Sequence, residues 1–381
     1  MSIYTQENTL RIAKRYQNKK RNYLLVNPLQ AKHIPVSPSQ SLKMMKTFGQ
    51  LLYKKYPQTN LIIGFAETAT AIGAAVASCF SKSCIYLHTT RESIPEVNHW
   101  IEFSEEHSHA VEQKLSADKL LDWIKQSDTI LFIEDEISTG KTLINMIQKL
   151  KQHFPILSEK KLIAASILNR VSSDNLEKLH QAGILCESLV QLAETDYTSI
   201  MEKLNVQPAL PVEPLSQKLN CDNSFHIPCN NPRQGVGIED YTQSCNQIAQ
   251  TFITKYKDVL HSSQSILILG TEECMYPALL MGKQIEDKFD IPVRCHATTR
   301  SPIGICSAES YPIINGYKIS SFYSSTRDTY IYNLSHYDTV IIVTDTMANN
   351  LDGIRSLMGA LQPYTIKNLF CVQGGNYVWY I

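Results

Sequence analysis

Two adjacent carboxylates precede a run of small and hydroxyl residues about a third of the way along the chain. The acids are Glu134 and Asp135, and the run is Ser138-Thr139-Gly140-Lys141-Thr142. Hydroxyl groups and the backbone N–H groups of small residues can converge on one anion, and the positive end of a following helix attracts the same anion. Carboxylates at the same place favour positive charge that develops in a transition state. The segment therefore predicts a phosphate site next to an electrophilic centre.

An apolar strand and an amphipathic helix must position this segment. Residues 129–133 form the apolar run, and Leu143, Met146, Ile147 and Leu150 follow at helical spacing. The letters Gly-Lys-Thr invite comparison with a nucleotide-binding P-loop, which needs glycine five positions before Gly140. Asp135 stands there, so that interpretation fails. An ordinary strand–turn–helix without a ligand is the plain alternative.

The order of strand, two acids, two variable residues and then Ser-Thr-Gly-Lys-Thr resembles the loop that binds 5-phosphoribosyl 1-pyrophosphate (PRPP) in type I phosphoribosyltransferases. The resemblance implies that Glu134 and Asp135 hold the ribose hydroxyls. Ser138, Thr139, Gly140, Lys141 and Thr142 would hold the 5-phosphate. It also implies Mg²⁺, held mainly through PRPP, because magnesium suits phosphate oxygens.

Further segments fit the same scheme. The loop with Ala66, Glu67 and Thr68 joins a strand to a small-residue helix over 71–77 and resembles the family's pyrophosphate-binding loop; a plain strand–helix turn is the alternative. Arg91 follows the next strand, where the orotate phosphoribosyltransferase group places a basic residue on pyrophosphate. A surface ion pair with Glu92 is its alternative role.

Two further groups are candidates. His107 and His109 lie in the interval that holds the family's closing loop, and they are candidates for acid/base catalysis, for a His-x-His metal site or for a solvated polar loop. Lys32 and His33 precede the first core helix, where family members build the hood over the acceptor. They are therefore candidate acceptor-binding residues.

The chain contains the same pattern twice. Leu61-Ile62-Ile63-Gly64 matches Leu267-Ile268-Leu269-Gly270, Thr89-Thr90-Arg91 matches Thr298-Thr299-Arg300, and Asp128-Thr129-Ile130 matches Asp338-Thr339-Val340. After Ser37 and Pro38, which are typical of a helix start, four apolar residues follow at roughly helical spacing, and the second copy has a matching set: Leu42, Met45, Phe48 and Leu52, and Tyr241, Cys245, Ile248 and Phe252. Each copy alternates short apolar strands with helices, which predicts an α/β fold of two tandem, doubly wound parallel-sheet units of phosphoribosyltransferase-like fold. The predicted boundaries are a basic arm over 1–26, a phosphoribosyltransferase domain over 27–204, a proline-containing linker over 205–230 and a second domain over 231–381.

The second copy is degenerate at the phosphate cradle. Its counterpart of Ser-Thr-Gly-Lys-Thr is Ala-Asn-Asn-Leu-Asp, so Asp352 would repel a phosphate. Thr299-Arg300-Ser301-Pro302 resembles the signature of the TRSP domain, which follows a phosphoribosyltransferase domain in bacterial proteins linked to tellurite-resistance gene clusters. Thr299, Arg300 and Ser301 are candidates for a shared site, for a second anion site or for a packing remnant of the duplication.

Composition and charge indicate which partners and which cellular location to expect. Lys plus Arg and Asp plus Glu each total 36, and no helix-turn-helix or basic face accompanies the fold, so we expect no nucleic-acid partner. No apolar run suits a signal peptide or a membrane span, and the ten cysteines form no Cys-x-x-Cys pair, so we expect a cytoplasmic protein with reduced thiols. The fold often pairs subunits, which makes a homodimer a candidate assembly.

The sequence favours a PRPP-dependent pentosyltransferase. It would transfer phosphoribose to an unidentified base-like acceptor and release pyrophosphate, in the synthesis of a nucleoside-like metabolite. A PRPP-binding regulator without transferase activity is the alternative from another class, because degenerate members of this fold become binding modules. A relative of PRPP synthetase is the third, although the chain lacks an evident ATP motif.

Overall fold

The computed structural model describes residues 3–18, 21–103, 113–346 and 351–381. Contacts divide the chain into two compact units. The first comprises Met1–Gln6, Lys43–Glu194 and Asn230–Gln243, and the second comprises Glu7–Leu42, Thr195–Cys229 and Ser244–Ile381. Of the helices in the described ranges, none combines the length and the hydropathy needed to cross a membrane. The domain boundaries drawn along the sequence remain a prediction.

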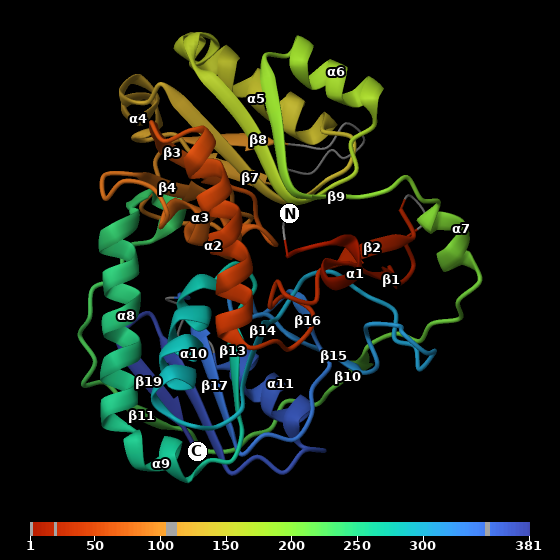
Figure 1. Cartoon of the computed structure of the whole chain (residues 1–381). Coiled ribbons are helices and arrows are strands. Elements are labelled where there is room, and N and C mark those ends of the chain that lie inside the picture. Colours follow the sequence, from red (N-terminus) through yellow and green to blue (C-terminus); the bar gives the residue numbers. More distant parts are fainter. Residues whose placement is uncertain (1–2, 19–20, 104–112, 347–350) are drawn as a thin grey trace. The chain divides into compact units, whose positions relative to one another are not determined.

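A six-stranded sheet forms the centre of the first unit (Figure 1), in the order β12-β4-β3-β7-β8-β9. All neighbours are parallel except β12, which pairs antiparallel with β4. The strands are β3 (Thr59–Gly64), β4 (Ile85–His88), β7 (Thr129–Ile137), β8 (Lys161–Asn169), β9 (Ile184–Gln191) and β12 (Val236–Gly237). A separate antiparallel hairpin consists of β5 (Trp100–Phe103) and β6 (Gln113–Ser116).

Helices follow the strands of the first unit. They are α3 (Thr70–Ala77), α4 (Leu120–Gln126), α5 (Lys141–His153) and α6 (Ser173–Gln181), with the 3₁₀ helices η1 (Pro155–Glu159) and η2 (Pro232–Gln234). Helix α3 consists of small apolar residues, all of them buried, and packs on β3, β4 and β7. Small side chains therefore bring this helix close to the sheet beneath the loop that precedes it.

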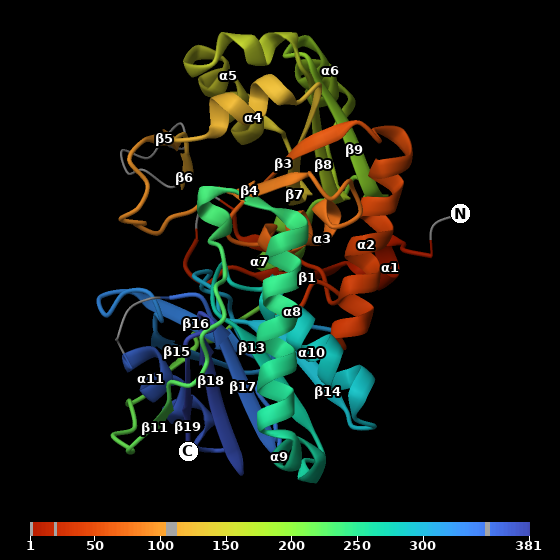
Figure 2. The same cartoon turned by 90° about the vertical axis from the view of Figure 1, so that its left-hand side faces the viewer.

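The second unit contains a comparable sheet, in the order β11-β19-β18-β17-β13-β14 (Figure 2). Strands β18, β17, β13 and β14 are parallel, and β19 and β11 extend the sheet antiparallel beyond β18. The strands are β11 (Asn220–Asp222), β13 (Ile266–Gly270), β14 (Val293–Ala297), β17 (Thr339–Thr344), β18 (Asn368–Gln373) and β19 (Tyr377–Tyr380). Helix α10 (Tyr276–Lys288) packs on β13, β14 and β17, and α9 (Lys257–Ser262) and α11 (Asp352–Leu361) also belong to this unit.

Smaller elements complete the second unit. A three-stranded sheet joins β10 (Leu210–Pro211), β15 (Gly316–Ser320) and β16 (Asp328–Tyr332), and a hairpin joins β1 (Arg11–Lys14) and β2 (Tyr23–Val26). The short helix α1 (Gln6–Thr9) precedes that hairpin in the sequence, and α7 (Tyr197–Glu202) packs against both of its strands. The hairpin packs into one apolar cluster with Ile303, Tyr311 and Tyr332, which explains why residues 7–42 group with the second unit.

Two long helices confirm the predicted periodicity. Helix α2 (Pro38–Lys55) begins at the proline expected at its first position, and α8 (Ile238–Lys255) is its counterpart. The residues predicted for their inner faces are all buried: Leu42, Met45, Phe48 and Leu52 in α2, and Tyr241, Cys245, Ile248 and Phe252 in α8. Parallel strands, each followed by a helix, occur in both halves, so the predicted duplication of an α/β unit is confirmed.

Candidate functional site

The two acids of the sequence motif lie within strand β7, and this corrects the expected end of that strand. The sequence predicted a strand that stops at Ile133, but pairing with β8 continues through Glu134, opposite Ser166, and Ile137, opposite Asn169. The partner strand β8 is equally long, so its backbone groups satisfy those of the acidic segment. The turn is correspondingly short, and α5 begins at Lys141.

Three consecutive carboxylates therefore stand at the carboxyl end of β7, each half-buried: Glu134, Asp135 and Glu136. Burial raises the pKa of Glu134 well above its ordinary value of 4.5, and the charges of Asp135 and Glu136 raise it further. Burial and then Glu136 also raise the pKa of Asp135, although a hydrogen bond donated by the Thr68 hydroxyl lowers it. A bound positive charge or a set of hydroxyl donors would relieve this repulsion.

The loop after β3 meets the acids through Thr68. Phe65 donates its backbone N–H to the carbonyl of Ile133 on β7 at 3.0 Å, and the Ala66–Glu67 peptide is cis. Ala66 is buried, whereas Glu67 and Thr68 are half-buried. The predicted pyrophosphate loop and the predicted PRPP loop thus meet at the same edge of one sheet.

A three-residue hydrogen-bond network fixes Ala66, and the sequence analysis missed it. The Ala66 N–H donates to the Thr89 hydroxyl at 2.9 Å, and that hydroxyl donates to Gln113 Oε1 at 2.5 Å. Gln113 Nε2 returns a hydrogen bond to the Ala66 carbonyl at 2.9 Å. Both backbone polar groups of Ala66 are therefore held from outside the loop. The repeated Thr-Thr-Arg pattern was a signal for Thr89, but no local pattern marks Gln113.

The phosphate cradle lies at the start of α5. Gly140 caps this helix with φ 71°, a left-handed conformation that glycine adopts without steric cost. An added Cβ would lie 3.0 Å from the Leu179 side chain. Ser138 is half-buried, and Thr139, Lys141 and Thr142 are exposed. Exposed donors in front of a helix N-terminus form a surface that an anion can reach.

Two predicted groups are less defined. Arg91 is exposed directly after the Thr89-Thr90 turn, and its role on pyrophosphate stays a prediction. His107 and His109 lie outside the described residues. Among the residues that the structure does describe, no group of three or more His, Cys, Asp or Glu side chains is arranged to hold a metal ion.

The candidate acceptor residues are buried in the second unit. Lys32 is fully buried, and its ammonium donates to the carbonyls of Glu272 at 2.7 Å and of Thr298 at 2.9 Å. His33 is also buried, which lowers its pKa to about 3, with the charge of Lys32 as the next cause. Their acceptor role stays a prediction.

The second-unit candidates are held by a dense set of contacts. Thr299 pairs with Tyr330 in both directions through the backbone, and its hydroxyl accepts the Ser301 N–H at 3.2 Å. The Ser301 carbonyl accepts a hydrogen bond from the Tyr332 hydroxyl at 2.9 Å. Arg300 donates from Nε to the Glu272 carboxylate at 2.6 Å. The Thr-Arg-Ser segment thus fastens the loop after β14 to the neighbouring hairpin.

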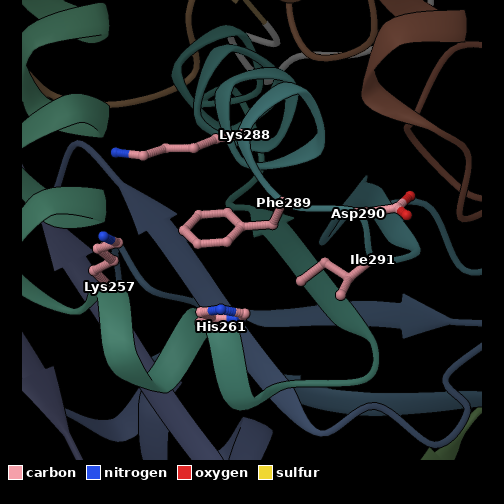
Figure 3. A pocket seen from close by; sticks show the side chains of 6 residues that line it. All are labelled: Lys257, His261, Lys288, Phe289, Asp290 and Ile291. Carbon is pink, nitrogen blue, oxygen red and sulfur yellow. The ribbon is translucent and has the colours of Figure 1, made fainter.

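A surface pocket of about 460 Å³ lies at the amino end of β14, far along the strand from the loops above (Figure 3). Phe289 and Ile291 form its apolar part, between Lys257, His261 and Lys288. All three basic side chains are exposed. Exposed cations around a shallow apolar patch do not form a built site, so the candidate site remains the edge formed by β3 and β7.

Two family models match the chain. A family model described as phosphoribosyl transferase matches residues 9–195, and a model described as the TRSP domain C-terminal to it matches residues 230–361. A search of curated proteins found no match.

Solved structures similar to this chain include two phosphoribosyltransferases. One is the adenine phosphoribosyltransferase of Giardia lamblia, complexed with 9-deazaadenine, which is 16% identical and has a TM-score of 0.36. The match covers 49% of this chain and 94% of the Giardia chain. The orotate phosphoribosyltransferase of Aeropyrum pernix is 17% identical with a TM-score of 0.27, covering 43% and 74%. The two family matches span most of the chain in the predicted order, and the protein belongs to the phosphoribosyl transferase family that carries a C-terminal TRSP domain.

Proposed function

We propose that the first unit transfers 5-phosphoribose from PRPP to a base-like acceptor and releases pyrophosphate, as a pentosyltransferase. The observation that carries the proposal is the hydrogen bond that the Thr68 hydroxyl donates to the Asp135 carboxylate at the carboxyl end of the sheet. In the sequence, the turn that leads through Gly140 into α5 follows these acids. Carboxylates with raised pKa values and a helix N-terminus complement a ribose 5-phosphate, which has hydroxyl donors at one end and an anion at the other.

In the proposed reaction the bond between C1 of ribose and the pyrophosphate oxygen breaks, and pyrophosphate leaves with the electron pair. A nitrogen or oxygen of the acceptor forms the new bond on the opposite face of C1 and loses its proton to a base. Glu134 and Asp135 would hold the ribose hydroxyls and favour the positive charge on the ring. His107 and His109 are the candidate acid/base groups.

The other residues have separate roles in the proposal. Residues 138–142 would bind the 5-phosphate, and Ala66, Glu67, Thr68 and Arg91 would bind pyrophosphate. Mg²⁺ would be held mainly through the phosphate oxygens of PRPP, with the half-buried carboxylates at the carboxyl end of β7 as further oxygen ligands beside it. When bound, Mg²⁺ would neutralise the departing pyrophosphate. We further propose that the product is nucleoside-like and that the protein is a cytoplasmic homodimer. Its role would be linked to tellurite resistance.

Calorimetric titration with PRPP and Mg²⁺ tests the site. Asp135→Asn removes the charge that would accept hydrogen bonds from the ribose, and hydrogen bonds to charged groups contribute about 1.5–3 kcal/mol. We therefore expect PRPP to bind this variant about 10-fold or more weakly. Asp345→Asn is the matched control, because Asp345 is the repeat counterpart of Asp135 in the second unit. No binding to the wild type, or equal weakening by both variants, would overturn the proposed site.

Release of pyrophosphate distinguishes the enzyme from a PRPP sensor. The wild type is incubated with PRPP, Mg²⁺ and a panel of purine, pyrimidine and other nitrogen-containing bases, and pyrophosphate is measured. Release that depends on one acceptor and falls in Asp135→Asn supports the transferase. Tight PRPP binding without release for any acceptor favours the regulator.

A further inference from the structure

The two units share one hydrogen-bond frame, and it defines equivalent positions. In the second unit the Thr298 N–H donates to the Gly270 carbonyl at 3.1 Å, and the Thr298 hydroxyl accepts the Glu272 N–H at 3.0 Å. The first unit makes the same two bonds with Thr89, at 2.9 Å each, and there the residue that donates to the hydroxyl is Ala66. Glu272 therefore stands where the first unit has Ala66.

The same frame places Arg300 at the position of Arg91. Each arginine directly follows a threonine that pairs through its backbone with the neighbouring hairpin: Thr90 with Lys114 and Thr299 with Tyr330. The basic residue is thus kept in both units. The residue that pairs with Arg300 in the second unit is Glu272, and the equivalent position in the first unit is Ala66, which carries no charge.

The Glu272 carboxylate is fully buried, and both of its oxygens accept hydrogen bonds. Its Oε2 accepts from Arg300 Nε at 2.6 Å and from an Arg327 amino group at 3.0 Å, and its Oε1 accepts from the Ser321 hydroxyl at 2.5 Å. The two guanidinium groups are only partly covered, with side-chain exposures of 13% for Arg300 and 27% for Arg327. An anion of the right size could therefore reach them from solvent if the carboxylate were absent.

The backbone of Glu272 is held as firmly as its side chain. Its φ is 46°, in the left-handed region that residues with a side chain rarely adopt. The Lys32 ammonium donates to its carbonyl at 2.7 Å, and Thr298 holds its N–H. This conformation and these contacts direct the Glu272 carboxylate onto two arginines, and Glu273 adds a second, longer ion pair to Arg300 at 3.9 Å.

We propose that Glu272 is a built-in anion, which occupies an oxyanion site formed by Arg300, Arg327 and Ser321. With a small residue at position 272, this site would bind a free carboxylate or phosphate from solvent. On the proposed function, the second unit thus has the arginine of a pyrophosphate site, and the side chain of Glu272 occupies the place of the anion. The hydrogen-bond frame that the two units share then stabilises the second unit and supports ligand binding in the first.

Chemical rescue of Glu272→Ala with sodium formate tests the proposal, because formate has the size and charge of the deleted carboxylate. The melting temperature is measured in formate and in sodium chloride at equal ionic strength. We expect Glu272→Ala to melt below the wild type and to gain about 3 °C or more in formate, whereas the wild type gains less than about 1 °C. Formate is preferred to phosphate because the first unit also offers a phosphate cradle.

Glu272→Ala/Arg300→Ala serves as the control, since it lacks half of the guanidinium site and should show no gain in formate. A folded Glu272→Ala that responds to formate no more than the wild type overturns the proposal. If this variant is unfolded in chloride, its refolding yield decides: recovery in formate alone supports the proposal, and no recovery in formate overturns it. Glu272→Gln, which keeps the shape and loses the charge, should be less stable than the wild type without a formate response, because the amide blocks the site.

Discussion

The threonine that organises each loop allows the roles of the two units to be separated with one substitution in each. Thr89 and Thr298 are both fully buried, and each hydroxyl accepts the N–H of the loop residue at position 66 or 272. Valine has nearly the same shape but cannot accept that bond. Leaving a buried N–H without a partner costs about 1–3 kcal/mol, so Thr89→Val and Thr298→Val should lower the free energy of unfolding by similar amounts.

Their effects on PRPP should differ. In the first unit the Thr89 hydroxyl also donates to Gln113, which holds the Ala66 carbonyl, so valine releases both sides of the predicted pyrophosphate loop. Ordering the released loop again on binding would cost about the 1–3 kcal/mol of the lost hydrogen bonds, so we expect PRPP to bind Thr89→Val about 10- to 100-fold more weakly. Thr298→Val should bind PRPP as the wild type does.

The assay combines urea unfolding with calorimetric PRPP titration on both variants. Equal loss of PRPP affinity in both would mean that stability alone controls binding. Unchanged PRPP affinity in a destabilised Thr89→Val would show that the network around Ala66 does not position the loop. Either result refutes the reasoning from the hydrogen bonds.

Three further predictions follow from single features. Gly140→Ala should lose about 1–2 kcal/mol of stability and bind PRPP more weakly, because φ is 71° and the new Cβ would lie 3.0 Å from Leu179; urea unfolding and calorimetry check this. Because the folded-state pKa values of Glu134 and Asp135 are raised, the ligand-free protein should lose stability as the pH rises above 4.5. Over the same range the binding of Mg²⁺·PRPP should strengthen, since the carboxylates become charged. Asp135→Asn should make both the stability and the PRPP affinity depend less on pH. Burial lowers the pKa of His296 to about 4, so the contribution of the neutral imidazole to the free energy of unfolding is complete above pH 6.5. This contribution falls by about 1.4 kcal/mol per pH unit as the pH falls toward 4. An unchanged acid-unfolding profile in His296→Gln would contradict this.

The sequence predicted those parts of the fold that depend on local pattern. Apolar runs that end at glycine predicted β3 and β13, and the helical spacing of Leu42, Met45 and Phe48 predicted the buried face of α2. The motif also predicted correctly that a helix starts at the cradle, because glycine and small polar residues are typical of such turns.

Other features depend on partners that are distant in the sequence. The acids on β7 read as a loop because charged residues are uncommon in central strands, yet the long partner strand β8 keeps them in the ladder up to Ile137. Gln113 has no distinguishing context, and its importance arises only where it meets Ala66, 47 residues away. No pattern in the sequence singles out Glu272, because only the fold brings Arg300 and Arg327 to it.

The duplication shows which changes a buried frame tolerates. The backbone bonds made by Thr89 and Thr298 are fully enclosed, so losing either would leave polar groups without partners. The side chain at the equivalent position, Ala66 or Glu272, takes no part in those bonds and differs between the units without breaking them. Glutamate supplies a charge that pairs with Arg300, the repeat counterpart of Arg91, whereas alanine supplies none. On the proposed function, this one position can therefore account for a difference in what the two units would bind.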